Sequence, residues 1–162
     1  MVTNLGYRNG SFQPKPGVGP TGVGPDDYMY EAGVRLVRFC LPSKTPDPGP
    51  AMLRKAADLG FTTTVNLTRV SQLDRRRLVE LAALSEDAGT DVIYLADSNG
   101  SLLPDEVSGL VTLVRSVTGS AIGLHAHNNL GLALANSIAA VEAPVPPGSS
   151  RRSWAWARGR GT

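Results

Sequence analysis

Residues 121–131 read AIGLHAHNNLG, and this stretch decides the fold. An apolar run ends in His125 and His127, and a turn then leads into a helix-like stretch that reaches residue 143. Side chains two positions apart on a strand point to the same side, so the two imidazoles can bind one divalent ion. They are the only histidines in the chain, and they end a strand of the kind whose carboxyl end carries active sites in barrel enzymes. We therefore predict that His125 and His127 are metal ligands, with a chance pairing as the alternative.

Similar apolar runs precede this strand. They are rich in β-branched and apolar residues, as strands buried on both faces should be, and they cover residues 34–41, 61–67, 91–96 and 121–125. The last three runs end at Leu67, Ala96 and His125, which are 29 positions apart, the length of one βα unit. The spacing predicts an α/β fold with a parallel sheet built from repeated units.

Helix signals fill the intervals between these runs. Pro48 and Pro50 mark the start of the first helix, Ser71 the start of the second and Pro104 the start of the third, and glycines follow each of them at positions 60, 89 and 119. In the second helix, four leucines form the apolar stripe, at positions 73, 78, 81 and 84, and the arginines at 75–77 begin the solvated side.

Composition indicates one globular domain, since the 162 residues are 41% hydrophobic and 19% charged. The single cysteine, Cys40, excludes an internal disulfide and is predicted to be a buried strand residue. No apolar run approaches the roughly 20 residues of a membrane span, so we expect no membrane partner and a cytoplasmic protein.

Two segments lack the pattern of regular structure. Residues 9–25 are rich in glycine and proline and predict a long loop. Residues 144–162 combine prolines with four arginines and predict an irregular, disordered basic tail. Although Trp154 and Trp156 lie among these arginines, we expect no nucleic-acid partner, because no other feature supports one.

Three stretches together resemble a known family. Residues 123–142 (GLHAHNNLGLALANSIAAVE), 92–100 (VIYLADSNG) and, more weakly, 2–8 (VTNLGYR) are similar to strands of the HMG-CoA lyase-like, or DRE-TIM metallolyase, superfamily, and most closely to its 4-hydroxy-2-oxovalerate aldolases. The resemblance implies that residues 1–143 are a partial (β/α)8 TIM barrel, with apparent strands 2 to 6 and their helices.

The same resemblance implies a function. It implies an aldolase that binds Mn²⁺ or Mg²⁺ through His125 and His127 and stabilises a pyruvate enolate, with a small 2-oxo acid as substrate and an acylating aldehyde dehydrogenase as partner. Asp97 ends the neighbouring strand and is the candidate catalytic residue, where it would contact a metal-bound water or orient a ligand. A turn or helix-initiating role explains Asp97 equally well. Asn129 and Asn136 are candidates for orienting the loop and the helix, and capping or packing explains them nearly as well.

The chain also departs from the family pattern. The family's first strand carries an Arg-Asp motif with a third metal ligand, and no Arg-Asp dipeptide occurs here. Arg8 follows the wrong strand to replace it, and no third histidine is available as a base. We therefore expect activity only where another chain or a longer gene product supplies these parts. A coding sequence for residues 148–162 can be chosen whose shifted frame resembles the family's seventh strand, so a frameshift is a further hypothesis.

Two alternatives to the aldolase remain open at this point. Isopropylmalate or homocitrate synthases and HMG-CoA lyase share the His-Ala-His-Asn strand, although Ala96-Asp97-Ser98 favours the aldolase. The other alternative is a non-catalytic truncated remnant, whose incomplete sheet would leave open edges and favour self-association.

Overall fold

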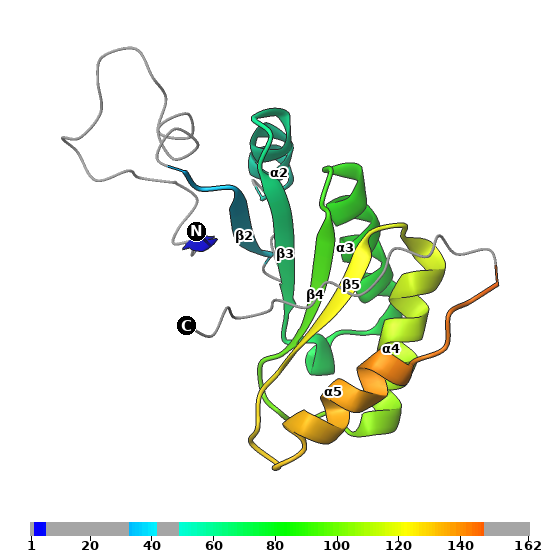
Figure 1. Ribbon diagram of the computed structural model, residues 1–162. Coiled ribbons are helices and arrows are strands. Elements are labelled where there is room, and N and C mark those ends of the chain that lie inside the picture. The colour runs from blue at the N-terminus through cyan, green and yellow to red at the C-terminus, as the bar shows by residue number, and fades with distance from the viewer. Residues whose placement is uncertain (1, 6–32, 42–48, 148–162) are drawn as a thin grey trace.

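The computed structural model describes residues 2–5, 33–41 and 49–147, and its centre is a parallel sheet (Figure 1). Five strands follow one another in chain order across the sheet, and they are β1 (Val2–Leu5), β2 (Leu36–Leu41), β3 (Thr62–Thr68), β4 (Val92–Asp97) and β5 (Ala121–Ala126). The last residues of β3, β4 and β5 are 29 positions apart, from 68 to 97 and from 97 to 126. The predicted parallel α/β sheet is therefore confirmed, with β1 and β5 at its two edges.

In the described part of the chain, four α-helices cover one face of this sheet (Figure 1). They are α2 (Gly49–Asp58), α3 (Arg75–Asp87), α4 (Pro104–Val117) and α5 (Ala133–Glu142). Their buried side chains join alternate strand residues in one apolar core, which includes Val37, Leu67, Leu95 and Ile122. This one-sided arrangement is that of part of a (β/α)8 barrel, in which the helices form the outer layer.

The predicted cap of the second helix, Ser71, was wrong by three residues. Ser71 lies in a short 3₁₀ turn, η1 (Val70–Gln72), that follows Arg69 in a left-handed conformation at φ 57°. The helix begins only after Asp74, whose side chain accepts a hydrogen bond from the Arg77 amide at 2.7 Å. Leu73, predicted as part of the apolar stripe, therefore precedes the helix.

The other face of the sheet is called the inner face below. Because side chains alternate along a strand, it carries the residues that point away from the helices, namely Arg38, Cys40, Thr64, Asn66, Tyr94, Gly123 and His125. Cys40 was predicted to be buried but is only partly so, because it lies on this face and outside the apolar core. A small separate cluster of Val92, Tyr94 and Ala121 packs here.

The ends of the chain lie mostly beyond this description. Helix α5 ends at Glu142, before the first proline of the predicted tail, and residues 143–147 have no regular structure. The rest of that tail, the predicted loop at 9–25 and Arg8 fall outside the described residues. In the part of the chain that is described, no helix is both long and apolar enough to span a membrane.

Candidate active site at the carboxyl end of the sheet

His125 and His127 lie where β5 ends, and their rings are close together. His125 belongs to the strand and His127 follows its last residue, so both imidazoles leave the chain on the same side. The ring centroids are 5.0 Å apart, with the ring planes inclined by 63°. Two imidazoles that each place a nitrogen about 2.1 Å from one ion need a separation of this order. The structure thus brings the two predicted ligands together in an arrangement that suits a shared cation.

These two imidazoles are only part of a complete coordination sphere. Within residues 33–41 and 49–147, together with the short β1, no three His, Cys, Asp or Glu side chains are grouped so that they could hold a metal ion. Imidazole nitrogens favour the later divalent metals, whereas Mn²⁺ and Mg²⁺ favour oxygen ligands. The described residues therefore supply two ligands for one metal ion, and its oxygen ligands would have to come from other groups.

Asp97, the predicted catalytic residue, lies on the opposite side of the sheet from the histidines. Its neighbour Ala96 pairs with His125, so the Asp97 side chain points toward the helix layer, where it is fully buried. Its Oδ2 accepts a hydrogen bond from the Leu102 amide at 2.9 Å, and its carbonyl accepts one from the Gly100 amide at 3.0 Å. The structure places Asp97 in a turn, and the catalytic role remains a prediction.

The turn that Asp97 holds packs against the loop of the histidines. Gly100 has a φ of 59°, and a Cβ added there would lie 2.9 Å from the carbonyl oxygen of His127 and 2.8 Å from the Asn129 amide. Asn136 on α5 donates from Nδ2 to the Leu102 carbonyl at 2.8 Å, so the backbone of Leu102 is held from both sides. Asp97 and Asn136 thus determine where the loop lies that supports His127.

The start of α5 is held by the asparagines that follow the histidines. The Oδ1 of Asn128 accepts a hydrogen bond from the Ala133 amide at 3.0 Å, which caps the helix. Asn129 is exposed and makes its close contact with Gly100 through the backbone. Asn136 thus binds the Leu102 carbonyl, and the orienting role predicted for it and for Asn129 stays a prediction; the side chain that meets the first amide of α5 is that of Asn128.

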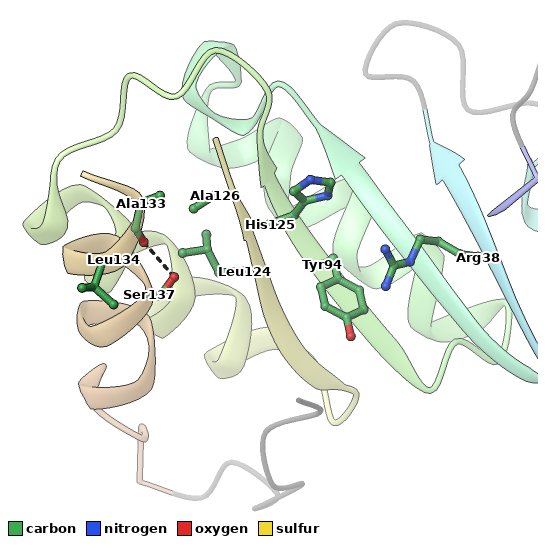
Figure 2. A pocket seen from close by; sticks show the side chains of 8 residues that line it. All are labelled: Arg38, Tyr94, Leu124, His125, Ala126, Ala133, Leu134 and Ser137. Atoms are coloured by element: carbon green, nitrogen blue, oxygen red, sulfur yellow. Dashed lines mark hydrogen bonds between the residues drawn. The ribbon is translucent and has the colours of Figure 1, made fainter. Parts of the chain in front are cut away.

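A cavity of about 440 Å³ opens beside His125 and continues around the free edge of β5 (Figure 2). Arg38, Tyr94 and His125 line it from the inner face, and Leu134 and Ser137 of α5 line it from the other side. Arg38 and Tyr94 were not predicted from the sequence to belong to this site. The available signal was that Arg38 is the one charged residue in the otherwise apolar run at residues 36–41.

The charges around this cavity are positive. The Arg38 guanidinium carbon lies 4.7 Å from the centroid of the Tyr94 ring, a cation–π contact. Partial desolvation lowers the pKa of His125, and the neighbouring positive charges of His127 and Arg38 lower it further. His125 is therefore held toward its neutral form, which is the form that binds a metal.

Sequence comparison relates the chain to known aldolases. Residues 48–146 match the HMGL-like family. A 4-hydroxy-2-oxovalerate aldolase from Geobacillus genomosp. 3 is 35% identical over 125 residues, which cover 75% of this chain and 37% of that protein. The chain thus spans little more than a third of the length of this relative.

Comparison with solved structures supports the same architecture. The carboxyl transferase domain of Rhizobium etli pyruvate carboxylase with pyruvate and biocytin superposes with a TM-score of 0.65 at 25% identity, over 74% of this chain and 22% of that one. HMG-CoA lyase from Bacillus subtilis superposes with a TM-score of 0.63 at 19% identity, over 77% and 54% of the two chains, which bears on the fold alone. The prediction of a partial (β/α)8 barrel is confirmed.

Proposed function

Because this chain belongs to the HMGL-like family, we propose that it forms part of the active site of an aldolase-type lyase that cleaves or forms 4-hydroxy-2-oxo acids. The observation that carries the proposal is the pair of imidazoles, 5.0 Å apart at the carboxyl end of β5, in a segment that matches aldolases of this name. The remaining parts of such a site would come from outside the described residues.

In this proposal each residue has a distinct role. His125 and His127 hold a divalent metal, Mn²⁺ or Mg²⁺, which when bound would act as a Lewis acid on the substrate carbonyl. Asp97 acts through the backbone of the loop after β4, and so positions the histidine loop. The substrate is a small 2-oxo acid that enters the cavity beside β5.

A non-catalytic chain is the second candidate, and one observation favours it. Among the described residues no third metal ligand stands near the two histidines. A chain that lacks this third ligand would keep the fold and bind a metal weakly, but it would not convert the substrate.

The experiment is a retro-aldol assay with Mn²⁺ and 4-hydroxy-2-oxovalerate, and pyruvate release is the readout. It is run on the full chain alone and on the full chain mixed with a second chain that carries the missing Arg-Asp strand. We expect release from the mixture that is lost in His125→Ala and kept in Arg76→Ala, since Arg76 lies on the exposed side of α3. A parallel condensation assay with acetyl-CoA tests the synthase alternative. A folded, metal-loaded chain that releases no pyruvate in either assay would leave the non-catalytic candidate standing.

A further inference from the structure

We propose that Arg38, which contacts the Tyr94 ring, binds the carboxylate of the substrate in the cavity beside His125. The identity of that acid rests on the proposed function, whereas the presence of a carboxylate site rests on the geometry alone.

Arg38 is a partly buried cation that has no counter-ion among the described residues. It lies on the inner face of β2, where its Nε is buried and has no hydrogen-bond partner. Between the described residues, ion pairs join Arg76 and Arg77 to Glu80, and none involves Arg38. A cation removed from water is costly unless an anion or a hydrogen-bond acceptor meets it. An anionic ligand would supply the negative charge and the hydrogen-bond acceptors that the described protein groups do not give to Arg38.

Two carboxylates that lie on or just before the described strand β4 already form hydrogen bonds elsewhere. Asp97 at the end of β4 points into the helix layer and binds the Leu102 amide. Asp91, just before β4, accepts hydrogen bonds from Thr63 through its Oδ2. Neither of them can therefore serve as the anion for Arg38 without breaking a bond that holds the fold.

The guanidinium of Arg38 lies against the Tyr94 ring. Its central carbon is over the ring, 4.7 Å from the centroid, and the two side chains lie next to each other in Figure 2. A guanidinium has five N–H donors, so one that contacts an aromatic ring can still form two parallel bonds to one carboxylate.

The absence of a side chain at Gly123 leaves the space that the Tyr94 ring occupies. A Cβ added at Gly123 would lie 2.5 Å from both Cδ1 and Cε1 of Tyr94, a distance that side chains do not tolerate. The register explains the contact, because Tyr94 pairs directly with Gly123 across β4 and β5. A side chain at position 123 would therefore push the ring away and disturb the stacked arginine.

The cavity suits a small organic acid. Its volume of about 440 Å³ lies within the range usual for small-molecule sites. Arg38 and His125 supply positive and polar groups on the inner face, and Leu124, Ala133 and Leu134 supply apolar surface on the other side of β5 (Figure 2). A small acid whose carboxylate meets Arg38 would therefore occupy the inner-face side of the cavity, beside His125.

The test is a calorimetric titration of the full chain with pyruvate in the presence of EDTA, so that no metal contributes. We expect the wild-type chain to bind pyruvate and Arg38→Met to bind it at least about tenfold more weakly, as expected for loss of a charge-assisted contact. Arg38→Lys keeps the charge without the planar fork and should fall between the two. Pyruvamide, which lacks the carboxylate, should not bind to any of these chains.

Matched controls separate the site from general effects. Tyr94→Leu removes the ring and should weaken pyruvate binding, whereas Tyr94→Phe keeps the ring and should bind pyruvate more tightly than Tyr94→Leu. Arg76→Met removes an exposed arginine on α3 and should have no effect. Circular dichroism establishes that each variant is folded, and Arg38→Lys remains informative if Arg38→Met does not fold.

The inference and the proposed function can fail separately. Equal pyruvate affinity in the wild type, Arg38→Lys and Arg38→Met would overturn the inference, and so would a wild-type chain that binds no pyruvate. Pyruvate binding that depends on Arg38 in a chain without aldolase activity would sustain the inference and remove only the proposed reaction.

Discussion

Asp97 influences the histidines through the backbone. Its Oδ2 binds the Leu102 amide and its carbonyl binds the Gly100 amide, and Gly100 in turn contacts the loop of His127. We expect Asp97→Ala to lower the free energy of unfolding by about 1–3 kcal/mol, because the buried Leu102 N–H would lose its acceptor. Urea denaturation measures the change. Asp97→Asn is the control, since its amide oxygen can still accept this bond, and equal losses in both variants would contradict the explanation.

The pKa of His125 makes stability depend on pH in a defined direction. Its pKa in the folded chain lies below the value of about 6.5 expected for the unfolded chain. Below that value the unfolded chain binds more protons, so the stabilisation is present above pH about 6.5 and is lost as the pH falls through the folded pKa. We expect melting temperatures to fall more between pH 7 and pH 5 in the wild type than in His125→Gln. Parallel curves for the two chains would contradict this prediction.

The types of the ligand side chains also determine which metal the chain prefers. With two imidazoles and no carboxylate among the described candidate ligands, we expect Zn²⁺ or Ni²⁺ to bind more tightly than Mn²⁺. Equilibrium dialysis of the full chain measures the order, and His125→Ala should abolish the binding. Tight, stoichiometric Mn²⁺ that persists in His125→Ala would show that the metal site lies elsewhere.

At the scale of elements, the pairing of β4 with β5 depends on the absence of a side chain at Gly123. We expect Gly123→Ala to destabilise the chain by about 1–3 kcal/mol, as overpacking does, because the new Cβ would meet the Tyr94 ring. The same change introduced into Tyr94→Ala should cost much less. Thermal or urea unfolding of the two single variants and the double variant completes the cycle. Additive effects would mean that the ring is not the obstacle.

The elements were predictable from the sequence to the extent that their signals are local. The apolar runs at 61–67, 91–96 and 121–125 predicted β3, β4 and β5 to within one residue at each end, because each run is bounded by turn or helix signals. The start of α3 was not predictable in this way. Ser71 and Asp74 are both good caps, and the left-handed Arg69 with its 3₁₀ turn decided between them.

Only those residues of the site that are close together in the sequence could be predicted to lie together. The spacing of His125 and His127 on one strand indicated that they share a side, which the ring geometry agrees with. Arg38 lies 87 positions before His125, and only the sheet register brings β2 and β5 to one face. Strands buried on both faces do not show which face is which, so Asp97 was assigned to the histidine side although it points to the helices.

At the scale of the whole molecule, one side of the described structure is apolar and exposed. Among the described residues the sheet ends at β5, and the helix next to it, α5, has an exposed apolar stripe in which Leu134 is 76%, Ile138 49% and Val141 46% exposed. An open strand edge beside apolar surface favours association between chains. We expect the sedimentation coefficient to rise with concentration in the wild type and to remain constant in Ile138→Lys. The matched control is Val117→Lys, which changes an exposed apolar residue on a different helix, α4, and should behave like the wild type.

The order of the strands has a consequence for the way the chain acquires its structure. Each strand pairs with the one just before it in the chain, and the side-chain bonds between neighbouring units join residues only 26 to 34 positions apart. Each unit can therefore dock onto its predecessor as it leaves the ribosome, without waiting for a distant partner. Strands with a neighbour on both sides should open last. In amide hydrogen exchange, β3 and β4 should accordingly retain their protons longest, while β5, which has one neighbour, should lose its protons first among these three.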